Sequence, residues 1–185
     1  MGRADEGPRP FDLRHLDLAP GEAREFEHPV EVGDVRIGGQ RYTPVPAVPT
    51  ARVEVSQSAS GWHFRLRVEA AYRGSCWRCL EEAQVPLRAD VRDFAAFGRG
   101  AAGAPFDEDL DCEYLDGESL DIAAMARDAL VELLPSTILC RPECAGLCPS
   151  CGANLNIGPC GCDPPSSDGR WEALREIAER LGSDG

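Results

Sequence analysis

Eight of the nine cysteines of this chain fall into four close pairs along the sequence. The pairs are Cys76 with Cys79, Cys140 with Cys144, Cys148 with Cys151, and Cys160 with Cys162. Two thiolates so close together can turn toward one metal ion at about 2.3 Å from each sulfur, and two such pairs complete a tetrahedral zinc site. The spacing therefore predicts two structural Zn²⁺ sites.

The order of the cysteines suggests how they divide between the two sites. We assign to one site the four that lie closest in sequence, which need no long-range folding: Cys148, Cys151, Cys160 and Cys162. The other site takes the remaining four, which can meet only inside a folded body: Cys76, Cys79, Cys140 and Cys144. One alternative groups Cys140, Cys144, Cys148 and Cys151, with Cys76, Cys79, Cys160 and Cys162 as the second set. Another alternative is a single occupied site.

Disulfide bonds are an alternative to metal ligation, since paired cysteines also occur in oxidised secreted domains. The N-terminal residues 1–10 contain no apolar segment that could act as a signal peptide. No apolar run approaches the roughly 18 residues of a membrane span. We therefore expect a cytoplasmic protein with reduced cysteines and no membrane partner.

A thiol redox role is a second alternative for Cys76 and Cys79, because thioredoxin-like enzymes place this spacing at the start of a helix. Residues 85–91 instead alternate with the two-residue period of a strand, so the pair is expected on a loop between strands. We assign no catalytic residue. Cys112 stands alone and is expected to be a small buried hydrophobic residue.

The chain carries a formal net charge of −13, and its 19 basic residues are all arginine. Two four-thiolate zinc sites would each add about −2. An acidic protein repels the phosphates of nucleic acids, whereas zinc-containing nucleic-acid modules carry a basic surface. The charge therefore favours a basic protein over bare RNA as the partner.

The clearest strand runs from Trp62 to Tyr72, where every second residue is apolar. Residues 85–91 repeat this pattern and are the expected partner strand. Residues 74–82 then form the end of a hairpin that presents the first cysteine pair. Pro86 points outward from this partner strand, which indicates an edge strand or a bulge.

Apolar residues at helical spacing between Ile122 and Leu134 predict an amphipathic helix, with Ser119 as its N-cap and Pro135 beyond its end. A second amphipathic helix is expected after Asp168. Together these elements predict an α+β fold, in which a helix packs on an antiparallel β-sheet and a zinc-bound, cysteine-rich lobe follows.

The chain is expected to divide into three parts. Residues 1–10 form a disordered N-terminus. Residues 11–135 form the α+β body, with a zinc knuckle at 76–79. Residues 136–185 form the cysteine-rich zinc lobe and the C-terminal helix.

The same residues resemble one known family. The motifs that carry the resemblance are Cys76-x-Arg78-Cys79-Leu80, Leu133-Leu134-Pro135, Cys140-x3-Cys144-Ala-Gly146-Leu147-Cys148-Pro149-x-Cys151-Gly152-x-Asn154-Leu155-Asn156, Cys160-x-Cys162 and Asp168-Gly-Arg170-Trp171. In this order they are similar to the YceD family, the large ribosomal RNA subunit accumulation proteins. The similarity is dense over residues 62–174.

The resemblance implies a cytoplasmic bacterial or organellar factor, needed for normal levels of large-subunit ribosomal RNA and without established enzymatic chemistry. With the acidic charge, it suggests a ribosome biogenesis factor that holds a basic ribosomal protein of the large-subunit precursor. A direct RNA-binding zinc ribbon using Arg78 and Arg141 is the alternative, and a thiol redox protein is less favoured. Trp77, between two ligands, is expected to pack over the metal, or otherwise to contact a partner.

Overall fold

The computed structural model describes residues 10–97 and 112–162, together with residue 174. It is mostly an antiparallel sheet with one helix, so the predicted α+β class is confirmed. The disordered N-terminus and the helix predicted after Asp168 fall outside the described residues, apart from residues 10 and 174. Within the described part, no helix combines the length and the apolar character needed to cross a membrane.

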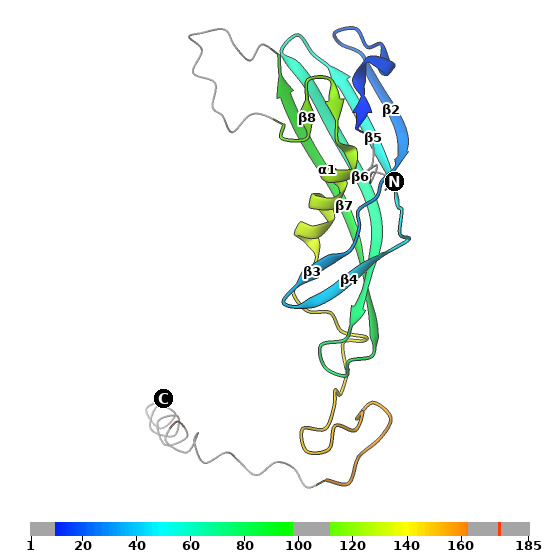
Figure 1. The fold of residues 1–185 in the computed structure, drawn as a ribbon, viewed down its shortest axis with the longest axis vertical. Coiled ribbons are helices and arrows are strands. Elements are labelled where there is room, and N and C mark those ends of the chain that lie inside the picture. The colour runs from blue at the N-terminus through cyan, green and yellow to red at the C-terminus, as the bar shows by residue number, and fades with distance from the viewer. Residues whose placement is uncertain (1–9, 98–111, 163–173, 175–185) are drawn as a thin grey trace, which may run out of the picture.

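The main sheet is built around one long hairpin (Figure 1). Its strands are β2 (Ala23–Pro29), β3 (Val35–Ile37), β4 (Gln40–Val45), β5 (Thr50–Gln57), β6 (Gly61–Ser75) and β7 (Glu82–Ala96). β7 pairs with β6 along the whole length of both strands. The other edge of β6 is shared by β5 and β4, which continue into β2 and β3 respectively. All of these pairings are antiparallel.

The pairing predicted between residues 62–72 and 85–91 is present in this hairpin. Leu66 in β6 lies opposite Val91 in β7, and Tyr72 lies opposite Val85. Pro86 in β7 lies opposite Ala71. Among the described strands β7 pairs only with β6, so the edge position predicted from Pro86 is confirmed.

Helix α1 (Ile122–Leu133) covers one face of this hairpin (Figure 1). Its buried side chains include Met125, Ala126 and Leu130, which join the alternate residues of β6 and β7 in one hydrophobic core. Because one face of the sheet is covered and the other is open, β5 and β6 alternate between buried apolar residues and more exposed polar ones.

The start of α1 differs from the prediction. The N-cap is Asp121, whose Oδ1 accepts a hydrogen bond from the Ala124 N–H at 2.9 Å. Ser119, the predicted cap, lies instead in a strand opposite Asp12. That strand, β9 (Ser119–Leu120), belongs to a small sheet with β1 (Phe11–Asp12) and β8 (Leu115–Asp116), and η1 (Leu13–Leu16) follows β1. Pairing with a distant strand thus outweighed the capping preference of serine.

The turn of the β6–β7 hairpin (76–81) meets the described residues after α1, which we call the cysteine lobe (136–162) (Figure 1). The Trp77 N–H donates to the Ile138 carbonyl at 2.9 Å, and the Leu147 N–H donates to the Arg78 carbonyl at 3.1 Å. Inside the lobe a single β-bridge joins Leu147 to Asn154. The fold therefore positions the lobe through the hairpin end.

The core predicts a clear difference between two leucines. Leu66 is fully buried in β6, whereas the Leu133 side chain at the end of α1 is 48% exposed. Leu66→Ala should lower the free energy of unfolding by roughly 2–5 kcal/mol, and Leu133→Ala by less than about 1 kcal/mol. Urea unfolding followed by circular dichroism measures both. Equal losses would contradict the core assignment.

Candidate metal centres

The structure brings together the four cysteines Cys76, Cys79, Cys140 and Cys144, which we call the first centre. Their Sγ atoms all lie within 4.8 Å of one another. The Cys76 and Cys144 sulfurs are 3.7 Å apart, and the Cys79 and Cys140 sulfurs are 3.6 Å apart. Four sulfurs at 2.3 Å from one ion would be about 3.8 Å apart, whereas bonded sulfurs are about 2.05 Å apart. The spacing fits a four-thiolate metal site.

A second group consists of Cys148, Cys151, Cys160 and Cys162, which we call the second centre. These sulfurs also lie within 4.8 Å of one another. Only Cys148 is buried, whereas Cys151 and Cys162 are exposed. In the first centre three of the four cysteines are buried and only Cys140 is exposed. The two groups are those of the first division considered from the sequence, and the second group is the more accessible.

Both centres contain the same backbone turn. The Leu80 N–H donates to the Cys76 carbonyl at 2.9 Å, and the Gly152 N–H donates to the Cys148 carbonyl at 2.8 Å. The residue after the second cysteine is left-handed in each turn, with φ of 64° at Leu80 and 74° at Gly152. Glycine adopts this conformation freely, whereas for other residues it costs about 1–2 kcal/mol. Leu80 therefore holds a strained backbone.

The first cysteine of each turn is favoured as a thiolate. Burial opposes ionisation of Cys76, but backbone N–H groups directed at its sulfur, among them that of Cys79, lower its pKa to about 6. The N–H groups of Cys151 and Ser150 likewise lower the pKa of Cys148 to about 6. A metal needs its cysteine ligands deprotonated, so each turn presents one ligand that is ready at neutral pH.

Another cysteine of each centre resists ionisation. Partial loss of hydration at the Cys140 sulfur, followed by the neighbouring thiols, raises the pKa of this cysteine to about 12 although the residue is exposed. The neighbours Cys151 and Cys160 raise the pKa of Cys162 to about 12. Four thiolates without a cation would repel one another, and a bound cation removes that repulsion. The donor set therefore suits a divalent metal.

Asn156 supports the first centre, a role that the sequence analysis missed. Its Nδ2 lies 3.4 Å from the Cys144 sulfur, and this hydrogen bond lowers the pKa of that thiol. Its Oδ1 accepts from Arg141 Nη2 at 2.7 Å and from the Ala145 N–H at 2.9 Å. The amide is thus held with its donor toward sulfur. No local pattern distinguishes such an asparagine from one in a turn.

Further hydrogen bonds join the lobe to the hairpin end. Arg78 Nη1 donates to the Cys144 carbonyl at 3.0 Å, and Asn154 Nδ2 donates to Glu81 Oε1 at 2.8 Å. A Cβ on Gly146, where φ is 76°, would lie 3.2 Å from the Arg78 carbonyl oxygen. Glycine therefore permits the close approach that this junction needs.

The sequence also predicted the surroundings of Cys112 and Trp77, and only the first prediction is confirmed. Cys112 is buried, as expected, and burial raises the pKa of its thiol to about 12. Trp77 does not pack over the first centre, because its side chain is 63% exposed. The expectation of packing was wrong: the Trp77 backbone is bound to the lobe, but its indole faces outward.

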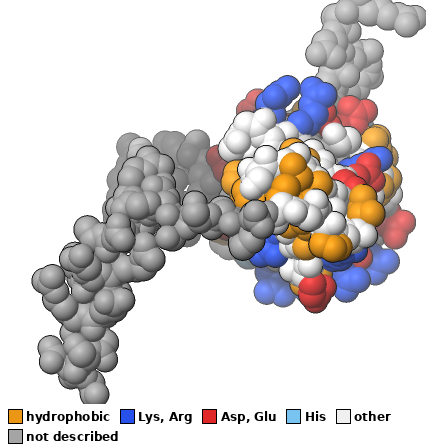
Figure 2. Space-filling model, turned by 90° about the horizontal axis from the view of Figure 1, so that it is seen from below, with side chains coloured by type: hydrophobic (Ala, Val, Ile, Leu, Met, Phe, Trp, Pro, Cys, Tyr) orange, Lys and Arg blue, Asp and Glu red, His pale blue; other side chains and the backbone are white. Residues whose placement is uncertain are grey.

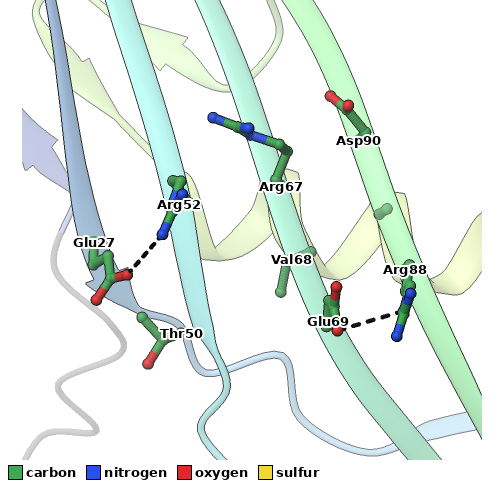
Figure 3. Close-up of a pocket in the computed structure, with 9 residues that line it drawn as sticks. Glu27, Thr50, Arg52, Arg67, Val68, Glu69, Arg88 and Asp90 are labelled. Atoms are coloured by element: carbon green, nitrogen blue, oxygen red, sulfur yellow. Dashed lines mark hydrogen bonds and ion pairs between the residues drawn. The ribbon is translucent and has the colours of Figure 1, made fainter.

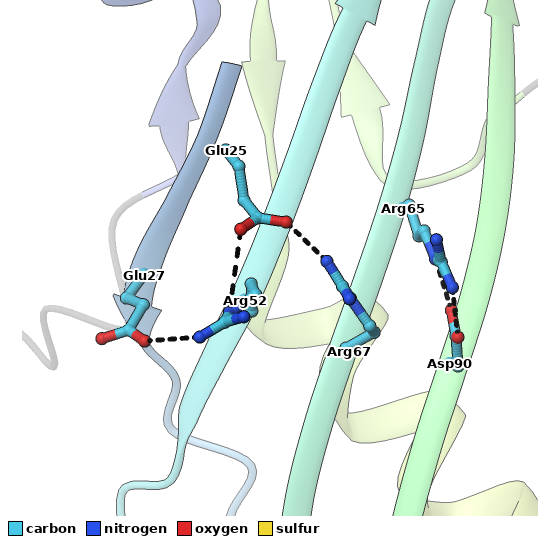
Figure 4. A network of polar contacts seen from close by, with 6 residues as sticks. All are labelled: Glu25, Glu27, Arg52, Arg65, Arg67 and Asp90. Atoms are coloured by element: carbon cyan, nitrogen blue, oxygen red, sulfur yellow. Dashed lines mark hydrogen bonds and ion pairs between the residues drawn. The ribbon is translucent and has the colours of Figure 1, made fainter. Parts of the chain in front are cut away.

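The open face of the main sheet carries paired charges (Figure 4). Arg65 makes two hydrogen bonds to Asp90, at 2.8 and 2.7 Å, and these lower the pKa of the carboxyl group. Glu25 lies between Arg52 and Arg67 and contacts both. Exposed pairs of this kind contribute little stability, but they leave the arginines facing carboxylates of their own sheet.

A depression on the same face is also lined by equal numbers of positively and negatively charged side chains (Figure 3). Three arginines and three carboxylates line it. Glu69 lies 3.5 Å from Arg88, and Glu27 lies 3.5 Å from Arg52. This depression therefore lacks the excess of positive charge that a phosphate-binding groove requires.

The sequence matches the family described as "Large ribosomal RNA subunit accumulation protein YceD" over residues 64–178, more than half of the chain and all eight paired cysteines. The chain belongs to the YceD family. Uncharacterized proteins of Mycobacterium tuberculosis and Mycobacterium bovis are 29% identical to it over 171 residues, covering 92% of this chain and 81% of theirs.

A YceD-family relative of Zea mays has a more informative name. "Large ribosomal RNA subunit accumulation protein YCED homolog 1, chloroplastic" is 25% identical over 195 residues, covering 85% of this chain and 67% of the maize protein. No solved structure gives a significant match. The family relationship thus rests on sequence, and the two cysteine centres are compatible with metal binding.

The two centres should respond differently to loss of a ligand. Cys76→Ser and Cys151→Ser should each remove one metal ion, counted by native mass spectrometry. Because the first centre joins the hairpin to the lobe, Cys76→Ser should lower the free energy of unfolding by roughly 3 kcal/mol or more. Cys151→Ser should lower it by less than about 1 kcal/mol. Equal destabilisation would contradict this difference.

Asn156→Asp should weaken metal binding at the first centre by about 10–100-fold, as loss of an outer hydrogen bond to a ligand does. The substitution keeps the acceptor for Arg141 but places a carboxylate oxygen against the Cys144 sulfur. Competition with a chromophoric chelator measures the affinity, in a Cys151→Ser background so that only one centre binds. Ser150→Ala in that background is the control, and unchanged affinity of the aspartate variant would exclude this role for Asn156.

Proposed function

We propose that this protein is a cytoplasmic, zinc-binding ribosome biogenesis factor that supports the accumulation of large-subunit ribosomal RNA without enzymatic activity. The observation that carries the proposal is the first centre, in which four cysteines from the hairpin and the lobe meet at metal-ligand spacing. The family description gives the process in which we place this scaffold.

Zinc fits the donor set of both centres. Four soft thiolates at tetrahedral spacing favour Zn²⁺ or iron–sulfur chemistry, and zinc is the usual ion of structural four-cysteine sites. Cys76, Cys79, Cys140 and Cys144 would hold one ion, and Cys148, Cys151, Cys160 and Cys162 the other. When bound, zinc supplies a cross-link and, with four protein ligands, no open position for substrate.

The remaining described residues support a non-enzymatic role. Eight cysteines are grouped at the two centres, and Cys112 is buried with a raised pKa, which disfavours a reactive thiol. The depression on the open sheet face is shallow and its charges are paired. These features favour a binding protein over a thiol redox enzyme or a nuclease.

The proposed partner is a basic ribosomal protein of the large-subunit precursor. The net charge of −13 attracts a basic protein, and each zinc-loaded centre adds about −2. Direct RNA binding through Arg78 and Arg141 is the alternative. Both guanidinium groups donate to acceptors of the lobe, Arg78 to Cys144 and Arg141 to Asn156, which favours a structural role for them.

Depletion of the protein in its own host should lower mature large-subunit RNA relative to small-subunit RNA by about 2-fold or more. Quantification of both RNAs and sucrose-gradient profiles of the subunits provide the measurement. Re-expression of the wild-type chain should restore the ratio, and Cys76→Ser should not. A normal ratio and a normal subunit profile after depletion would refute the proposed function.

A binding experiment separates the two partner classes. Immobilised protein would be offered RNA-free ribosomal proteins of the large subunit together with a large-subunit RNA transcript. We expect retention of one or a few basic proteins, weakened as salt rises. Preferential retention of the transcript would contradict the argument from charge and support the RNA-binding alternative.

A further inference from the structure

Two large apolar side chains are exposed at the end of the β6–β7 hairpin. Trp77 is 63% exposed and Leu80 is 66% exposed, and both belong to the turn that supplies Cys76 and Cys79 to the first centre. Single exposed hydrophobic residues are common, but two large ones in one short turn form a larger apolar surface, and tryptophan is enriched among the residues that dominate binding interfaces. Neither side chain is needed as a metal ligand.

Leu80 has a second unusual feature. Its backbone is left-handed, with φ of 64°, where the matching position of the second centre is Gly152. Glycine would form the turn without strain, so the metal site alone gives no reason for a leucine. Burial gives no reason either, because most of the side chain is in solvent. Strain that is retained at an exposed position points to a functional role for this leucine.

The end of the molecule that carries the lobe has apolar side chains near its middle and charged side chains at its edge. Figure 2, seen from the end where the lobe lies, shows hydrophobic side chains gathered near the centre of this end and charged ones around it. Ile157 in the lobe is 85% exposed. Asn154, three residues before it, is hydrogen-bonded to Glu81, the residue after Leu80. The lobe thus carries a further exposed apolar side chain and is joined to the turn by a hydrogen bond.

The charges next to the turn favour a cationic partner. Glu81 and Glu143 are exposed, and a metal-loaded four-thiolate centre is itself anionic. Arg78 and Arg141 are also exposed, and each donates to a neutral oxygen of the lobe, so their charges balance those of the two glutamates. The excess of negative charge therefore comes from the metal-loaded centre and from the net charge of −13. An apolar turn beside anionic groups matches an apolar side chain flanked by lysine or arginine, and it repels a phosphate backbone.

We propose that Trp77 and Leu80 form a docking surface for a polypeptide segment that carries an apolar side chain between basic residues. The inference rests on the proposed function and deepens it, because it assigns the place on this chain where the basic ribosomal protein binds. Trp77 supplies a large flat contact and Leu80 an aliphatic one. The aliphatic contact distinguishes this surface from one that stacks RNA bases, which would use aromatic side chains.

The test compares wild type with Leu80→Gly, Trp77→Ser and the control Val48→Ser, which alters an exposed valine outside the turn. The probe is the RNA-free mixture of large-subunit ribosomal proteins. We expect Leu80→Gly and Trp77→Ser to retain at least 10-fold less of the bound protein, and Val48→Ser to behave as wild type. Leu80→Gly should also keep both metal ions and unfold at the same or a higher urea concentration, since glycine relieves the strained φ.

The outcomes separate the two proposals. If wild type retains no ribosomal protein, the proposed partner is wrong, and the proposed docking surface is refuted as well. If wild type and Leu80→Gly retain the same protein equally, the partner stands and the docking surface is refuted. If Leu80→Gly loses metal or stability, Leu80 is a structural residue and the inference is also overturned.

Photo-crosslinking identifies what touches the turn. A benzophenone amino acid in place of Trp77 would be irradiated with the ribosomal proteins and a large-subunit RNA transcript present together, with the same group at Val48 as control. Adducts to a basic protein from position 77 alone support the docking surface. Adducts to the transcript, or to the segment of this chain after Pro165, would show a different occupant and overturn it.

Discussion

The junction between the β6–β7 hairpin and the cysteine lobe is the constraint on which the rest of the structure depends. The first centre takes one pair of cysteines from the hairpin turn and the other from the residues after α1. Its sulfurs can meet only if the hairpin reaches its full length and α1 packs on the sheet so that the chain returns. Backbone hydrogen bonds such as Trp77 to Ile138 hold the same junction without the sulfurs. Sheet core, helix packing and cysteine geometry therefore support one another.

The two centres share a turn but differ in what they organise. In the first, the ligands are 61 to 68 residues apart across the closest sulfur pairs, so the centre fixes long-range structure. In the second, all ligands lie within one short segment and two of them are exposed. Closing a long loop removes more freedom from the unfolded chain than closing a short one. We therefore regard the first as part of the body and the second as local support for the lobe.

Patterns with a fixed period could be predicted from the sequence, and features set by tertiary contact could not. The alternation around Leu66 predicted the hairpin, and the cysteine spacing predicted two groups that the structure brings together. The cap of α1 was misplaced because Ser119 is engaged by a strand far away in sequence. The outward indole of Trp77 and the contact from Asn156 to sulfur depend on how the lobe meets the turn, which no local pattern encodes.

The separation of the two halves of the first centre also sets an order of events during synthesis. The chain leaves the ribosome N-terminus first, so Cys79 emerges 61 residues before Cys140. At about 5–20 residues per second, the hairpin thiols wait roughly 3–12 s for their partners. During that interval Cys76 and Cys79 have no complete site. The first centre can therefore be completed only after translation has passed residue 144 and α1 has packed on the sheet.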